Sequence, residues 1–377
     1  MLKNEGALDA VIEAFMYRLG EFADQKQAFD FGEWLEIATI SIRVVPDQRR
    51  FSFDGVGTVF FGQPFGFIKD SVDYGDYINA VHTAMPLNSV VAMAPLWLRP
   101  VLLYCGIAIP KVFKAIMAAD GIRKTAIRET EIATARTTDF TSKRTDILSQ
   151  LISIKNDKPG SLTTNDIHVE MWAAVIAGSD STSGALRAIF YYLMKSPNAM
   201  RKLIEEIDDA FTEGTLTRPI QYNQAVKLPY LKAVIQEALR IFPPFAMPMP
   251  RYAPNEGLNL SGYHLKSGTK VGMNAMVVQF DKEIFGDDAH EFRPERWLQN
   301  KEKCREMERA MLVFGAGTRT CIGKHLSNAE MYKVVPEILR HFTVRMAHDQ
   351  PWKTRNATFI MQSNVICKLE RRDVGRA

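Results

Sequence analysis

The segment from Asp166 to Lys195 constrains the fold of this chain more than any other part of the sequence. Its residues favour one long helix, which follows a polar loop with glycine and proline at Lys155–Asn165. In its middle, from Met171 to Gly178, every residue is apolar, so the helix has no polar face there. Such a helix belongs in the interior of a protein. We therefore expect this stretch to be buried.

Helical periodicity also dominates the rest of the chain. Near the N-terminus, apolar residues recur at i, i+3, i+4 and i+7, which is typical of an amphipathic helix. We expect a single domain over residues 1–377, mainly α with a minor β portion. The further predicted elements are helices at Leu8–Phe22, Met200–Phe211, Tyr230–Phe242 and Met331–His341, and a small β hairpin within Leu258–Val271.

The composition is that of an ordinary globular protein. Of the 377 residues, 46% are hydrophobic and 24% are charged. The net charge of +4 is dispersed along the chain, which argues against a nucleic-acid partner. The four cysteines are far apart, so we expect neither a disulfide framework nor a structural zinc site, and a reducing compartment fits. The first residues show neither the apolar core of a signal peptide nor a transmembrane span.

The segment Val91–Ile109 comes closest to a membrane-spanning stretch. Pro95, Arg99 and Pro100 interrupt it, whereas a spanning helix needs about 20 mostly apolar residues. Two interpretations remain open: the segment is buried core, or it forms a surface that dips into a bilayer.

The run from Phe314 to Gly323 contains a cysteine in an unusual setting. Glycines at 315, 317 and 323 allow the backbone to approach a flat group and let N–H groups point at a sulfur. Cys321 precedes a predicted helix, whose N-terminus favours a thiolate. Arg319, two residues earlier, can pair with a carboxylate. A buried structural cysteine in a glycine-rich turn is the alternative.

A second constellation is a charged pair on the predicted Tyr230–Phe242 helix. Glu237 and Arg240 are three residues apart and share a face of the helix, near its apolar residues. Because buried charges need complete pairing, Arg296 is a candidate third partner. An exposed pair, which would stabilise little, is the alternative.

A third constellation follows the apolar stretch of the long helix. Asp180, Ser181 and Thr182 are costly to bury there unless they form hydrogen bonds or handle protons and water. The alternative is a helix kink, in which a hydroxyl bonds to the carbonyl four residues earlier.

Other cofactor patterns are missing from the sequence. Gly315 and Gly317 do not form a dinucleotide fingerprint, because position 320 is Thr and no strand precedes them. The seven histidines show no metal-binding spacing. A nicotinamide site on this chain is therefore not expected. Lys324, His325 and Arg319, near the cysteine, are candidates for docking an acidic partner.

Together and in this order, the motifs resemble those of the cytochrome P-450 family, from about Leu8 to Leu369. The resemblance implies the cytochrome P-450 fold, a helical domain with small β-sheets, here without its N-terminal anchor and first helices and strands. It also implies a haem b cofactor, with Cys321 as the axial ligand and the sole protein ligand of the iron. The other implied roles are haem contact by Arg319, Arg251, Phe314, Gly315, Gly323 and Ala177; proton delivery by Asp180 and Ser181, with Thr182 as a substitute; substrate contact by Phe245, Ala246, Met247, Ile360 and Met361; and a structural network of Glu237, Arg240 and Arg296 that stabilises the Cys loop.

The residues in and around the motifs are most similar to those of filamentous-fungal microsomal members of the pisatin-demethylase-like group. This implies a monooxygenase of secondary metabolism that inserts one oxygen atom of dioxygen into a hydrophobic small molecule. Its electrons would come from NADPH-cytochrome P-450 reductase. The resemblance also implies the cytoplasmic face of the endoplasmic reticulum membrane, although the chain shows no transmembrane segment of its own.

Two features depart from the family pattern. The chain begins where the family would already be past its anchor and first elements, and Ile40–Arg50, with Pro46, interrupts what should be one helix between Trp34 and Phe60. Both are what an incorrect gene model or a decayed paralogue would give, with residues 40–50 as an aberrant insertion. We therefore expect weak haem retention. Two alternatives stay open: a reductase-independent haem-thiolate isomerase or peroxygenase, and an inactive truncated paralogue.

Overall fold

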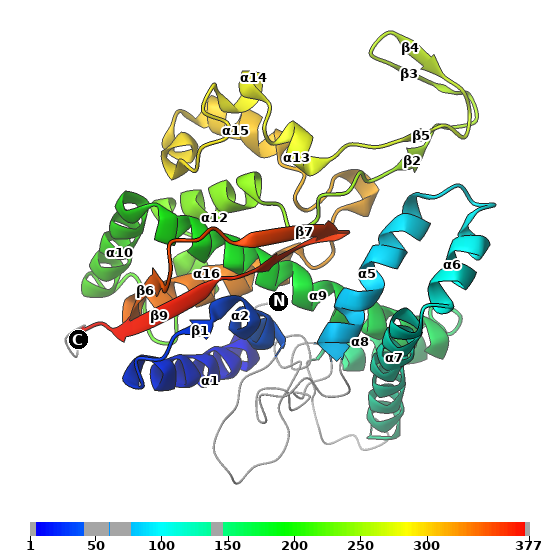
Figure 1. Ribbon diagram of the computed structural model, residues 1–377. Helices are drawn as coiled ribbons and strands as arrows, with labels where there is room; N and C mark the ends of the chain where they lie inside the picture. The colour runs from blue at the N-terminus through cyan, green and yellow to red at the C-terminus, as the bar shows by residue number, and fades with distance from the viewer. Residues whose placement is uncertain (1–4, 41–59, 61–76, 137–145, 374–377) are drawn as a thin grey trace.

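The computed structural model describes residues 5–40, 60, 77–136 and 146–373 of the chain (Figure 1). Helix α9, Thr164–Lys195, runs through the middle of the molecule and begins with a capping box. The Thr163 hydroxyl accepts a hydrogen bond from the Asp166 N–H at 3.1 Å, and the Asp166 carboxylate accepts one from the Thr163 N–H at 2.8 Å. The long helix predicted from the sequence is thus confirmed.

The two halves of α9 differ in burial. From Thr182 to Tyr191 every residue is buried. Within the apolar stretch from Met171 to Gly178, by contrast, only Met171 and Val175 are buried, and Trp172 is 37% exposed. The expectation that this stretch is buried all round is therefore wrong, because one apolar flank of α9 is not covered by the residues that the structure describes.

Helices make up most of the described structure. The predicted helices at 8–22, 200–211, 230–242 and 331–341 are confirmed as α1, α10, α12 and the larger part of α16. The helices besides α9 are α1 Glu5–Asp24, α2 Phe31–Ile40, α5 Tyr77–Met93, α6 Arg99–Ile107, α7 Pro110–Arg136, α8 Ile147–Asp157, α10 Pro197–Thr212, α11 Tyr222–Ala225, α12 Pro229–Ile241, α13 Ala275–Val278, α14 Lys282–Phe285, α15 Lys301–Ala310 and α16 Lys324–His341, with the short 3-10 helices η3 Pro294–Leu298 and η4 Gly317–Arg319.

The strands form small antiparallel sheets. The hairpin predicted within Leu258–Val271 is confirmed as β3 and β4, whose two-residue turn has positive φ at Ser261 (49°) and Gly262 (82°), as a type I′ turn requires. One sheet has the order β1-β9-β6, and the pairs β2-β5, β3-β4 and β7-β8 stand alone. The strands are β1 Phe29–Asp30, β2 Arg251–Tyr252, β3 Leu258–Leu260, β4 Tyr263–Leu265, β5 Lys270–Val271, β6 Phe342–Met346, β7 Lys353–Ala357, β8 Phe359–Ser363 and β9 Ile366–Arg371.

The main core lies between α1, the second half of α9, α10, α12 and α16 (Figure 1). The apolar face of α1 enters it through Phe15, which is 1% exposed, and Leu19, which is fully buried. A buried ion pair fixes the start of α1 to α16, since Lys333 Nζ lies 2.7 Å from Glu5 Oε1 and 2.6 Å from Asp9 Oδ1. The mainly α fold with small sheets that the sequence predicted is confirmed.

Helices α5, α6 and α7 form a separate group beside this core (Figure 1). The segment Val91–Ile109 lies here and is not core, because Trp97 is 76% exposed and Tyr104 79% exposed. Within the described ranges, no single helix is long and apolar enough to cross a membrane; α6 and the first part of α7 would reach that length only together, and they meet at a bend of 97°.

The insertion predicted at 40–50 falls almost wholly on residues outside the described ranges. The same holds for most of the helix expected between Trp34 and Phe60. Helix α2 extends to Ile40, the last residue described before this part of the chain.

Candidate functional site

The loop before α16 has a compact hydrogen-bonded form. The Cys321 N–H donates to the Phe314 carbonyl at 2.8 Å, and the Gly315 N–H donates to the Leu312 carbonyl at 2.9 Å. Gly315 has φ of 69°, and a Cβ at this position would lie 3.4 Å from the Arg319 carbonyl oxygen. A side chain would strain both the backbone and this contact. The glycine that the sequence singled out is therefore needed for the shape of the loop.

Cys321 is exposed and lies just before the N-terminus of α16. Its neighbour Ile322 is 90% exposed. The alternative of a buried structural cysteine is therefore wrong for this position; Cys367 is the buried cysteine, and burial raises the pKa of its thiol. Cys321 is thus presented as a ligand or nucleophile.

The exposed flank of α9 carries part of the third constellation predicted from the sequence, Asp180 and Ser181. Ala177 is exposed, and its carbonyl accepts a hydrogen bond from Ser181 Oγ at 2.7 Å. This is the bond to the carbonyl four residues earlier that the kink alternative describes, and it weakens the regular helix bonding at this turn. Asp180 Oδ1 lies 3.7 Å from Nε2 of His82 on α5. The sequence reasoning missed His82, which is a lone histidine without any motif.

Thr182 points elsewhere, into the contact between α9 and α16. It is 2% exposed and donates to Ser327 Oγ at 3.1 Å. Its hydroxyl is also a hydrogen-bond partner of Glu330, which is 4% exposed. Burial raises the pKa of Glu330 to about 8, against a smaller opposite effect of the Thr182 hydroxyl. Sequence reasoning missed Ser327 and Glu330, which form no motif with the residues that it singled out.

Two arginines flank the Cys loop. Arg319 and Arg251 are exposed, and among the residues that the structure describes neither has a carboxylate partner. Arg251 donates to the carbonyl of Pro250 at 3.0 Å. The two segments are close, because a Cβ at Gly315 would lie 3.6 Å from Sδ of Met249. Two guanidinium groups near the loop, neither with a carboxylate partner among the described residues, favour a ligand with carboxylates.

These features fit a haem. An exposed cysteine can supply the axial ligand, the exposed alanine and glycines leave room for a flat ring, and the two arginines suit propionates. In the described part of the chain, no three His, Cys, Asp or Glu side chains gather around a point that could hold a bare metal ion. A metal that comes with its own four ring ligands needs only one from the protein.

The predicted residues Glu237, Arg240 and Arg296 lie together and are almost completely buried. Arg240 Nε and Nη2 each donate to the Glu237 carboxylate at 2.9 Å, and Arg296 Nε donates at 2.8 Å. The Trp297 indole N–H and the Arg293 backbone N–H, both at 2.9 Å, complete the donors. The exposed-pair alternative is wrong, since the two arginines and the glutamate are at most 1% exposed.

The candidate substrate residues divide into two groups. Ala246 and Ile360 are buried, at 3% and 7% exposure, and pack with Ala188 and Phe242. Phe245, Met247 and Met361 are partly exposed. The segment after α12 and strand β8 are joined, because the Ile360 N–H donates to the Pro244 carbonyl at 2.8 Å. The partly exposed residues remain the candidates for substrate contact.

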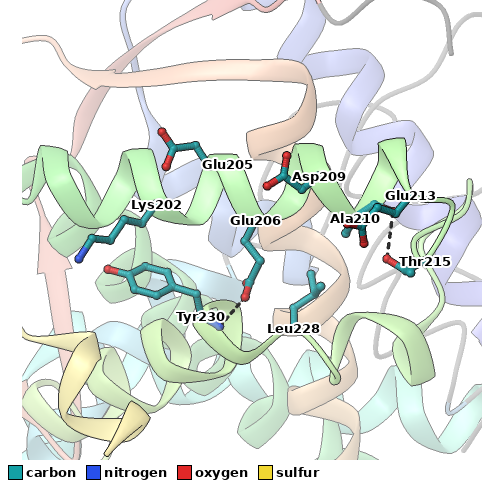
Figure 2. Close-up of a pocket in the computed structure, with 9 residues that line it drawn as sticks. All are labelled: Lys202, Glu205, Glu206, Asp209, Ala210, Glu213, Thr215, Leu228 and Tyr230. Carbon is teal, nitrogen blue, oxygen red and sulfur yellow. Dashed lines mark hydrogen bonds between the residues drawn. The ribbon is translucent and has the colours of Figure 1, made fainter.

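A separate hollow of about 440 Å³ lies between α10 and α12 and contains none of the predicted site residues (Figure 2). Its acidic lining has a structural role. The Glu206 carboxylate accepts hydrogen bonds from the backbone N–H groups of Tyr230 at 2.7 Å and Leu231 at 2.8 Å, which caps the first turn of α12. We assign no cofactor to this hollow.

The sequence matches the profile of the family described as Cytochrome P450 over residues 3–367. It is 76% identical over 372 residues to "Cytochrome P450 monooxygenase ACRTS1" of Alternaria alternata, a match that covers 99% of this chain and 96% of that protein. It is 30% identical over 365 residues to "Pisatin demethylase" of Fusarium vanettenii, over 96% of this chain and 67% of that protein. The fold is similar to a crystal structure of a cytochrome P450 (CYP102L1), with a TM-score of 0.77, 22% identity, and coverage of 99% of this chain and 75% of the other.

Replacing Glu237 should destabilise the protein severely. In Glu237→Ala two arginines stay buried without their carboxylate, which costs about 3–5 kcal/mol of the free energy of unfolding. Glu237→Gln keeps the volume and should lose less. The measurement is urea unfolding followed by circular dichroism. As a control, Glu308→Ala removes a carboxylate that is 42% exposed and pairs with Lys232, and it should cost less than about 1 kcal/mol. Equal losses for Glu237→Ala and the control would contradict the role of the network.

Proposed function

Because this chain belongs to the cytochrome P450 family and is an enzyme of it, we propose that it is a haem-thiolate monooxygenase with haem b as its cofactor. It inserts one oxygen atom of dioxygen into a hydrophobic small molecule of fungal secondary metabolism. One observation carries the proposal: Cys321 is exposed in a glycine loop at the start of α16, and α16 contacts the helix that carries Asp180 and Ser181. The names and fungal sources of the relatives support the metabolic setting.

Different residues around the loop would contact different parts of the cofactor. A bound haem with a thiolate ligand supplies the activation of dioxygen and favours cleavage of its O–O bond. Cys321, which is exposed just before the start of α16, is the residue that would hold the iron. Arg319 and Arg251 would pair with the propionates, and exposed Ala177 leaves a flat place against α9.

Asp180 and Ser181 are suited to deliver protons. The Ser181 hydroxyl donates to a carbonyl of its own helix, and it can exchange this bond for one to a reacting oxygen. His82, whose side chain is 27% exposed, lies 3.7 Å from Asp180 and would connect it to solvent. Thr182 is less suited than Ser181 because it is 2% exposed and bonded to Ser327.

Electrons would arrive from NADPH-cytochrome P-450 reductase. Arg319, Lys324 and His325 are exposed beside Cys321 and form a basic surface. Such a surface favours association with an acidic partner and brings its electrons close to the thiolate.

The test of the proposal is the spectrum of the reduced protein with carbon monoxide. The wild-type chain, loaded with haem, should show the strongly red-shifted Soret band of a thiolate ligand, and Cys321→Ser should lose it. Cys105→Ser is the matched control, since Cys105 is also exposed but lies on α6, and it should keep the band. Retention of the band in Cys321→Ser would contradict the assignment of Cys321 as the thiolate ligand.

Replacing Ser181 should uncouple electron use from product formation. Without the hydroxyl, proton delivery fails and reducing equivalents leave as peroxide, so product per electron should fall by roughly 10²-fold. The measurement compares reductant consumed, peroxide formed and product formed. Ser153→Ala is the control, because Ser153 is on α8 and bonds only Asp157 on the surface. Unchanged coupling in Ser181→Ala would remove Ser181 from this role.

The group α5–α6–α7 is proposed as the surface that contacts the endoplasmic reticulum membrane. Between Leu87 and Ala119 the chain has no Asp or Glu but carries Arg99, Lys111 and Lys114. The large apolar residues exposed on it are Val90, Met93, Leu96, Trp97, Val101, Leu103, Tyr104, Ile107, Ile109, Phe113 and Met117. A patch of this size marks an interaction surface, and a basic apolar patch with Trp and Tyr suits an anionic lipid interface.

A charge in this patch should weaken membrane binding. Trp97→Glu replaces a residue that would enter the lipid, and its binding to phosphatidylcholine vesicles with phosphatidylserine should fall roughly 10-fold or more. Vesicle flotation measures the effect. Tyr263→Glu is the control, since Tyr263 is 74% exposed on β4, far along the chain from the patch. Equal binding of both variants and the wild type would contradict the proposed surface.

A further inference from the structure

The turn between β7 and β8 is formed by a single strained residue. Ala357 on β7 pairs with Phe359 on β8, so Thr358 alone makes the turn, with φ of 76°. This is the φ of the central residue in the rare, strained form of the γ-turn. The other non-glycine residues with positive φ in the described part of the chain are not β-branched: Lys26, Ser261 and Asn364. A β-branched residue is an outlier in this conformation, and such strain persists only where the surroundings hold it.

The hydroxyl of Thr358 is hydrogen-bonded to a distant helix. Its Oγ1 contacts Oγ of Ser89 on α5, although the two residues are 269 positions apart in the chain. The Ser89 hydroxyl also donates to the Met85 carbonyl at 2.8 Å. A serine hydroxyl has one proton, and a carbonyl oxygen can only accept. Thr358 is therefore the donor in its contact with Ser89, and the strained turn is joined to α5 by a directed hydrogen bond.

The same face of α5 makes a second contact, with the helix of the polar pair. His82 lies seven residues before Ser89, which is two helical turns, so both side chains are on one face of α5. Nε2 of His82 is 3.7 Å from Oδ1 of Asp180. Pro86 stands between the two contacts, inside the helix, where it has no N–H to donate to the His82 carbonyl. The half of α5 that carries Ser89 can therefore bend relative to the half that carries His82.

The two contacts attach α5 to both parts of the candidate site. His82 attaches it to α9, beside Ser181. Thr358 leads directly into Phe359, which forms a β-bridge with the substrate candidate Phe245, and their ring centroids are 5.9 Å apart. In Figure 1 the β7–β8 pair ends beside α5. Loss of the contact at the turn would therefore separate α5 from the substrate candidates but not from the polar pair.

We propose that Thr358 is a positioning residue: through its hydrogen bond to Ser89 it holds α5 against the β7–β8 turn, and so controls how fast small molecules reach the exposed flank of α9. The bond offsets the strain at Thr358, and a glycine, which would relieve that strain, could not form it. When the bond breaks, the Ser89 half of α5 moves from the turn and opens a path toward Ala177 and Ser181. The use of this path by a substrate rests on the proposed function, whereas the contact between helix and turn does not.

The first test is hydrogen exchange of the α5 backbone amides in the haem-loaded chain. Thr358→Val keeps the shape and strain of the turn but has no hydroxyl, so amides in the Ser89 half should exchange about fivefold faster, as the loss of one neutral hydrogen bond gives. Ser89→Ala should do the same, and the double variant should be no faster than either single one. Thr212→Val is the control, because the Thr212 hydroxyl bonds to the Asp208 carbonyl in its own helix, α10. Unchanged exchange in Thr358→Val, or additive effects in the double variant, would overturn the proposal.

The second test separates the hydroxyl from the strain. Thr358→Gly removes both, so it should melt at a higher temperature than Thr358→Val, while its α5 amides exchange just as fast. Thr358→Ser keeps the hydroxyl and should restore the slow exchange of the wild type. A merely structural role predicts that exchange follows the melting temperature. Slow exchange in Thr358→Gly, or fast exchange in Thr358→Ser, would therefore contradict the positioning role.

The third test measures access directly, with phenylimidazole as the probe, an apolar ligand of haem iron. In stopped-flow spectra of the haem-loaded chain, Thr358→Val should raise the association and dissociation rate constants together by about fivefold and leave Kd within about twofold of the wild type. The reason is that a weaker contact favours the open form with or without the probe. Thr212→Val should leave both rate constants unchanged. Wild-type rate constants in Thr358→Val would overturn the control of access.

The proposal and the thiolate assignment fail separately. Exchange of the α5 amides is read from the backbone, whichever residue binds the iron. Loss of the assignment of Cys321 by the carbon monoxide spectrum would leave the first two tests in force. A normal spectrum together with unchanged α5 exchange in Thr358→Val would remove the role of Thr358 alone.

Discussion

The structure around the cysteine depends on one buried carboxylate. Glu237 accepts hydrogen bonds from two arginines, an indole and a backbone N–H. Arg240 and Arg296 can lie in the interior because the negative charge of this carboxylate pairs with them. Arg240 in turn donates to the Gln279 carbonyl at 2.8 Å, and the Gln279 amide oxygen accepts from the Leu312 N–H at 2.9 Å. Leu312 begins the turn that ends in the Cys321 loop. The loop is thus held from α12 by an unbroken series of polar contacts.

The described part of the chain leaves exposed the surfaces that a cofactor would cover. On α9 the residues after Ser181 are buried by α10, α12 and α16, whereas Trp172 and Ala177 are open. On the loop, Cys321 and Ile322 are open as well. Exposed apolar surface costs about 25 cal/mol per Å², so a flat apolar ligand that covers both gains this free energy. The same reasoning applies to the exposed apolar surface of α5–α6–α7, for which we propose lipid as the cover.

Much of the fold could be predicted because its signals are local. The period of apolar residues predicted α1 and α10, Pro229 marked the start of α12, and the alternating residues within Leu258–Val271 predicted a hairpin. Burial could not be predicted in the same way. Met171–Gly178 is apolar on all sides, yet one flank is open, since periodicity shows which side chains avoid water but not whether protein or ligand covers them. Val91–Ile109 stayed open between core and surface for the same reason.

The sequence by itself determined the chemistry of the site: which cysteine follows glycines at a helix start, and which acid and alcohol follow an apolar helix. These depend on neighbours along the chain, so spacing suffices. Only the tertiary structure decided the directions of the side chains. Ser181 and Thr182 are adjacent and chemically alike, but Thr182 faces α16 and Ser181 bonds within its own helix. Glu330 and His82 have no motif, because their contacts come from groups that the fold brings together from distant parts of the chain.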